Sequence, residues 1–127
     1  MAKINQLILL RRWRKVIYFK IIHYIYSEHI FKTQEAFKNK HERVAFCAAV
    51  DRNGYLPTHN LIYSQPQSDD PTWNAGNCRN RRIFNDRTGL AAGQNTNPFV
   101  MQTYRRDMGG GSFVMMKDLS APIFVNG

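Results

Sequence analysis

Residues 99–117 read FVMQTYRRDMGGGSFVMMK, and they show the clearest secondary-structure pattern in the chain. Two segments, Phe99–Asp107 and Ser112–Lys117, flank the triplet Gly109-Gly110-Gly111. Glycine adopts the positive φ angles of a tight turn without steric cost. The pattern therefore predicts a β-hairpin with a glycine turn, and Ala121–Val125 is predicted to begin a third strand.

Upstream of this hairpin, from residue 44 onward, Gly, Pro, Asn and Asp divide the chain into short pieces, which is typical of strands and loops. The apolar run Val44–Val50 predicts a buried strand. Asp51–Gly54 is predicted to be a turn and Tyr55–Asn60 the strand that pairs after it. A long polar loop over residues 64–77 follows, and a short helix is predicted over Cys78–Asn85.

The N-terminal third has a different composition. Residues 4–40 contain neither Pro nor Gly, which permits a long helix. Apolar residues recur there at spacings of three or four, although the run over residues 16–22 is rich in β-branched and aromatic residues that also suit a strand. We predict a helix, and we divide the chain into a basic N-terminal helix, residues 1–43, and a folded domain, residues 44–127.

The net charge of +9 belongs mainly to that N-terminal third, which holds ten of the 18 Lys and Arg residues and three of the nine acidic ones. A small basic protein acting through residues 3–20 on nucleic acid or on an anionic membrane surface is therefore an alternative function. A solvated helix face explains the same charges equally well. The contacts in the alternative are the four cations around Trp13: Arg11, Arg12, Arg14 and Lys15.

Motifs for catalysis and for metal binding are missing from the sequence. There is no GxSxG elbow, no HExxH and no GxxxxGK[ST] loop, and Cys47 and Cys78 have no CxxC spacing. The most apolar segment, residues 16–31, is interrupted by charged residues, so no membrane-spanning helix is predicted. We therefore predict a protein that is not an enzyme and that has no metal or cofactor, with haem held through His59 as an outlying alternative.

Residues 79–87 contain four arginines in nine positions. Guanidinium groups bind carboxylates through two parallel hydrogen bonds, so such a cluster could converge on an anion. Surface pairing of the same arginines with Asp69, Asp70 or Asp86 explains the spacing as well. The residues alone are compatible with an anion site and with surface ion pairs.

Residues 45–126 resemble the sensor module of a group of bacterial methyl-accepting chemotaxis proteins, which has a PAS-like or Cache-like fold. The likeness covers about two-thirds of the chain, in order and at consistent spacing. Five motifs carry it: VDRNGYLPTHN at 50–60, SQP at 64–66, NCRNRRIFNDRTG at 77–89, TYRRD at 103–107 and MKDLSAPIFVNG at 116–127.

The resemblance implies an α+β fold in which a long N-terminal helix packs on a central antiparallel sheet. It also implies that a small ligand, a carboxylate or an amino acid, binds between the sheet and the loops over it. The expected anion contacts are Arg79, Arg81 and Arg82, and the further pocket residues are Tyr55, His59, Tyr104 and Asp118.

By the same resemblance, the chain is expected to be the ligand-sensing module of a membrane-associated chemoreceptor, and to form a homodimer through the N-terminal helix. Members of the family continue past Asn126-Gly127 to complete the last strand, so the chain is expected to be incomplete at its C-terminus. The signalling region of a receptor is not in the sequence. Nucleic acid is not an expected partner in this reading.

Overall fold

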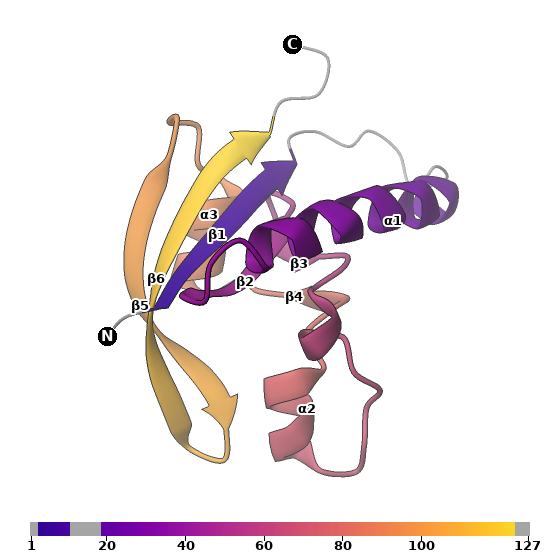
Figure 1. Cartoon of the computed structure of the whole chain (residues 1–127), viewed down its shortest axis with the longest axis vertical. Helices are drawn as coiled ribbons and strands as arrows, with labels where there is room; N and C mark the ends of the chain where they lie inside the picture. The colour runs from indigo at the N-terminus through magenta and orange to yellow at the C-terminus, as the bar shows by residue number, and fades with distance from the viewer. Residues whose placement is uncertain (1–2, 11–18, 124–127) are drawn as a thin grey trace.

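The computed structural model describes residues 3–10 and 19–123, and it is an α+β fold (Figure 1). Helix α1 lies in front of the main sheet in this view, and α3 lies behind it. The elements in chain order are β1 Lys3–Leu10, α1 Phe19–Lys38, β2 Val44–Val50, β3 Tyr55–Leu56, a 3-10 turn at Leu61–Tyr63, α2 Pro71–Asn77, β4 Arg82–Ile83, α3 Arg87–Gly93, β5 Val100–Gly109 and β6 Ser112–Ile123.

The predicted glycine hairpin is confirmed. Strands β5 and β6 pair antiparallel over almost their whole length, and all three glycines of the turn have positive φ angles, 88°, 59° and 77°. Strand β6 runs without a break to Ile123, so Ala121 belongs to this strand and the prediction of a separate third strand is wrong. The hairpin supplies one edge of a four-stranded sheet of order β2-β1-β6-β5.

The N-terminal residues depart from the prediction. Strand β1 lies between β2 and β6 and is parallel to both, so the sheet is mixed rather than wholly antiparallel. A central strand satisfies its backbone N–H and C=O groups on both sides, whereas a lack of Pro and Gly only permits a helix. The prediction of one helix over residues 4–40 is therefore wrong for Lys3–Leu10, and α1 accounts for Phe19–Lys38.

The segment between β2 and β5 also differs from the prediction. Strand β3 pairs antiparallel with β4 in a small second sheet, instead of with β2. The helices of this segment are α2 and α3, and no helix forms over Cys78–Asn85. Each helix begins at an aspartate: Asp70 accepts the N–H of Thr72 at 2.8 Å, and Asp86 accepts the N–H of Gly89 at 2.9 Å. Caps of this kind stabilise a helix by about 1 kcal/mol.

The buried strand predicted at Val44–Val50 is confirmed, and it forms the middle of the core together with side chains from β3, α3 and β6. The core residues are Phe46, Ala48, Val50, Leu56, Ala92 and Met116. Cys47 and Cys78 are buried and free. Helix α1 is tied to the loop after β3 by Glu35, whose Oε1 accepts the Asn60 side-chain amide at 2.8 Å and the Leu61 N–H at 2.9 Å.

Candidate functional site

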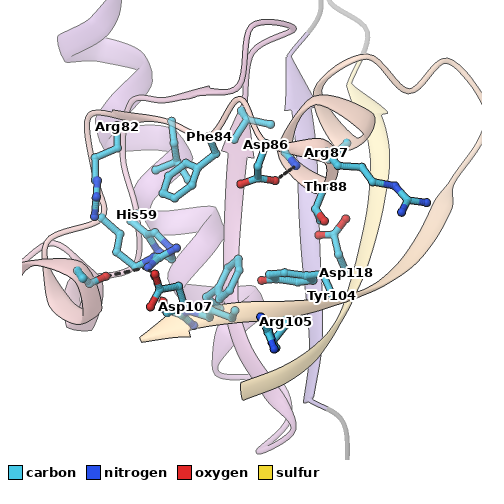
Figure 2. Close-up of a pocket in the computed structure, with 18 residues that line it drawn as sticks. His59, Arg82, Phe84, Asp86, Arg87, Thr88, Tyr104, Arg105, Asp107 and Asp118 are labelled. Carbon is cyan, nitrogen blue, oxygen red and sulfur yellow. Dashed lines mark hydrogen bonds between the residues drawn. The ribbon is translucent and has the colours of Figure 1, made fainter. Parts of the chain in front are cut away.

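A cavity of about 510 Å³ lies between the main sheet and the segments packed over it (Figure 2). Its lining comes from strands β2, β3, β4, β5 and β6, from His59, from the helices α2 and α3, and from the segment that joins them. The middle of the lining is apolar and includes Val50, Leu56 and Phe84. Charged side chains stand around this apolar middle, and their positions define the chemistry of the site.

The most unusual of these charges is Arg106, on the inner face of β5, which is the face toward the cavity. It is only 3% exposed, and its Nε and Nη2 atoms have no hydrogen-bond partner among the described residues. Its guanidinium carbon stands 4.4 Å from the centre of the Tyr63 ring and 4.9 Å from that of Phe46. Aromatic faces attract a cation, but they do not replace the hydrogen bonds it loses on leaving water. Arg106 therefore has donors left for a ligand.

Two further arginines stand near Arg106. The Nη1 of Arg79 donates to the carbonyls of Ala75 at 2.8 Å and of Asp107 at 3.3 Å. The pKa of Arg79 is lowered to about 10, mainly by burial and also by the positive charges of Arg106 and Arg82, while Tyr104 and Asp107 act in the opposite direction. Arg82 also lines the cavity and is exposed. Three guanidinium groups thus make one side of the cavity electropositive.

His59 lies within this electropositive side and is buried. Its Nδ1 accepts the backbone N–H of Asn60 at 2.8 Å, so the neutral ring carries its proton on Nε2. Burial holds the pKa of His59 well below its usual value, and the charges of Arg106 and Arg79 act in the same direction. His59 is therefore a neutral hydrogen-bond donor here and adds no charge of its own.

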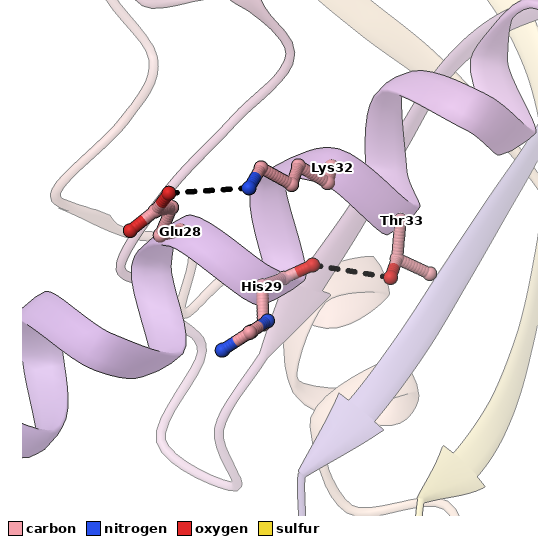
Figure 3. A network of polar contacts seen from close by, with 4 residues as sticks. All are labelled: Glu28, His29, Lys32 and Thr33. Atoms are coloured by element: carbon pink, nitrogen blue, oxygen red, sulfur yellow. Dashed lines mark hydrogen bonds and ion pairs between the residues drawn. The ribbon is translucent and has the colours of Figure 1, made fainter.

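Asp118 is the buried acid of the cavity, 3% exposed on the inner face of β6. Burial raises its pKa to about 6, although the Gln102 amide, which donates to Oδ2 at 3.3 Å, acts in the opposite direction. No cation of the described residues forms an ion pair with it. Among residues 28–123, the ion pair that forms joins Lys32 to Glu28 at 3.2 Å on the exposed surface of α1 (Figure 3).

The cavity brings together five of the seven residues that the resemblance indicated: Arg79, Arg82, His59, Tyr104 and Asp118. Arg81 is not among them, because it is exposed in a turn at φ 57° with its N–H donating to the Leu56 carbonyl at 2.7 Å. Tyr55 pairs with Ile83 in the small sheet and does not line the cavity. The basic residues of the alternative function, Arg11, Arg12, Arg14 and Lys15, lie outside the described residues.

The sequence analysis missed Arg106. A usable signal was present, because alternation along the predicted strand places Gln102, Tyr104 and Arg106 on one face. Tyr104 is one of the predicted pocket residues, so the same face of the strand indicates Arg106 as a further pocket residue.

No described helix combines the length and the apolar character that a bilayer crossing requires. The side chains that the structure describes, those of residues 28–123, also include no group of three or more His, Cys, Asp or Glu placed to bind a metal ion. Comparison with protein-family models, curated proteins and solved structures finds no match.

Proposed function

We propose that this chain is the ligand-sensing module of a bacterial chemoreceptor, with a PAS-like or Cache-like fold, and that its cavity binds a small anion through Arg106, Arg79 and Arg82. One observation carries the binding part of the proposal. Arg106 is a buried guanidinium with two nitrogen atoms that lack a partner in the described residues.

The physical argument rests on what a buried charge requires. Removing a charged group from water costs several kcal/mol unless a counter-charge and hydrogen bonds compensate. Two aromatic rings compensate Arg106 only in part. A carboxylate placed against Arg106, with Arg79 and Arg82 nearby, would supply the counter-charge and accept the unused N–H groups.

The sensing part of the proposal is supported by the link between the cavity and α1. His59 lines the cavity, and the next residue, Asn60, is held by Glu35 of α1. A ligand that moves His59 would therefore act on α1 directly. The family resemblance adds the rest of the proposal: a long N-terminal helix, a homodimer through that helix, and a membrane-associated receptor with its signalling region outside this sequence.

The test is a thermal unfolding screen of the full chain against small mono- and dicarboxylates, with chloride at equal ionic strength as the control. A ligand that binds only the folded state at 100 times its Kd stabilises the fold by about 2.7 kcal/mol. We expect one or more carboxylates to raise Tm, Arg79→Gln to weaken this response and Arg81→Gln, off the cavity, to leave it unchanged. A cooperative transition that no carboxylate shifts would overturn the proposal.

A further inference from the structure

Two buried side chains of opposite charge line the same cavity without neutralising each other. Arg106 has unused donors, and Asp118 has a single amide donor and no cation among the described residues. Both lie on the inner face of the β5–β6 hairpin. Asp118 stands opposite Gln102, which is four residues along β5 from Arg106. At about 3.3 Å per residue, the two positions are about 13 Å apart along the sheet.

Arg87 and Arg105 also line the cavity, but both are exposed and neither forms an ion pair with Asp118. The nearby Asp86 is engaged as the N-cap of α3, where it accepts the N–H of Gly89. Figure 2 places Asp118 and Thr88 on one side of the cavity and His59 and Arg82 on the other. Arg87 on the first side and Asp107 on the second also line the cavity, but each side contains one buried charge, Asp118 or Arg106, that forms no ion pair among residues 28–123.

We propose that the ligand is a zwitterion with separated charges, an ω-amino carboxylate, whose carboxylate binds at Arg106 while its ammonium binds at Asp118. The inference rests on the proposed function and narrows its ligand class. One molecule would then compensate both buried charges, and each contact would be a charge-assisted hydrogen bond.

The spacing excludes an α-amino acid as the molecule that bridges both ends. Such a ligand separates its ammonium and carboxylate by one carbon atom, and the Arg106 side chain closes only part of the distance along the hairpin. Tyr104, which lies between the two positions on the same face of β5, lines the cavity together with Phe84, Leu56 and Val50. A chain of several methylene groups fits this apolar middle, whereas a polar spacer would lose its hydrogen bonds there.

The experiment is isothermal titration of the full chain with 5-aminovalerate and with valerate, which differ by the amine alone. We expect 5-aminovalerate to bind about tenfold more tightly, since a favourable charge pair of 1.4 kcal/mol corresponds to a factor of ten. Asp118→Asn is expected to abolish the preference by weakening only the amine-bearing ligand. The α-amino isomer of 5-aminovalerate is expected to gain nothing over valerate.

Each outcome separates this inference from the proposed function. Equal affinities for valerate and 5-aminovalerate in the unmodified chain would refute the zwitterion and leave the anion site intact, and this comparison needs no variant. A preference that survives in Asp118→Asn would also refute it. If neither these ligands nor any other carboxylate binds, the proposed function fails together with the inference.

Discussion

Arg105 and Arg106 are neighbours on one strand with the same side chain, and they occupy opposite environments. Each guanidinium stands over aromatic rings: Arg105 is 4.2 Å from the Phe113 ring centre, and Arg106 is 4.4 Å from that of Tyr63. Arg105 is exposed on the outer face of the hairpin, although it also contributes to the cavity lining, whereas Arg106 is buried on the inner face. Water can satisfy the donors of Arg105, but only a bound group can satisfy those of Arg106.

The comparison extends along both strands. The outer face carries Met101, Phe113 and Met115, which are 60%, 45% and 53% exposed, while Met116 and Asp118 on the inner face are almost fully buried. Strand alternation assigns each residue to one face, so adjacent positions make matched pairs. Substitutions at such pairs test whether the inner face alone holds the core and the site.

The largest expected effect on stability comes from the methionine pair. Met116→Ala should lower the free energy of unfolding by about 2–5 kcal/mol, because it leaves a cavity beside Phe46 and Val50 in the core. Met115→Ala should change it by less than about 0.5 kcal/mol, as exposed substitutions do. Urea unfolding followed by circular dichroism measures both. Equal losses would mean that the outer face is packed in solution.

The next effect concerns the pH dependence contributed by Asp118. Its pKa is about 6 in the folded state against an ordinary value of 3.8. The folded state therefore holds the proton more tightly, and stability falls as pH rises from about 4 to about 6, by up to about 3 kcal/mol. Asp118→Asn should remove this fall.

Unfolding free energies at a series of pH values from 4 to 7 check that expectation. His59, with its lowered pKa, gives the opposite slope: its contribution is present above its usual pKa of 6.5 and is lost as pH falls. Because His59 is present in both proteins, the difference between the two profiles isolates Asp118. Parallel profiles would show that Asp118 is not buried as described.

The smallest effect belongs to the outer face. Phe113→Ala removes the ring under Arg105, and an exposed cation–π contact contributes about 0.5–1 kcal/mol. The loss should stay within that range, and the response to carboxylates should remain unchanged. A loss of that response would break the comparison, because it would connect the outer face to the site.

The sequence predicted the elements whose signals are local. The glycine triplet and the apolar run Val44–Val50 predicted the hairpin and the buried strand, since turn geometry and burial pattern act over a few residues. The strand Lys3–Leu10 was not predicted, because it depends on partners more than 30 residues away along the chain. The family resemblance is a hypothesis. Five of the seven pocket residues that it implies line the cavity.

The rest of the site depended on packing that no local pattern reports. Asp70 and Asp86 looked like ion-pair partners for the arginines, but backbone N–H groups at two helix starts engage them instead. Arg81 follows Arg79 by two positions, yet a positive φ angle directs it out of the cavity. Strand alternation places Arg106 on the face of Tyr104, but its enclosure depends on Phe46 and Tyr63, which are distant in sequence.

The central claim is that Arg106 is kept for a ligand and not for the fold. The most direct measurement is the unfolding free energy of ligand-free Arg106→Met, with Arg105→Met as the control. Replacing an uncompensated buried charge with an apolar side chain of similar length should raise that free energy by about 1–3 kcal/mol and abolish stabilisation by carboxylates. Arg105→Met, at an exposed position, should not raise that free energy. A clear loss of stability in Arg106→Met, with the carboxylate response retained, would contradict the account.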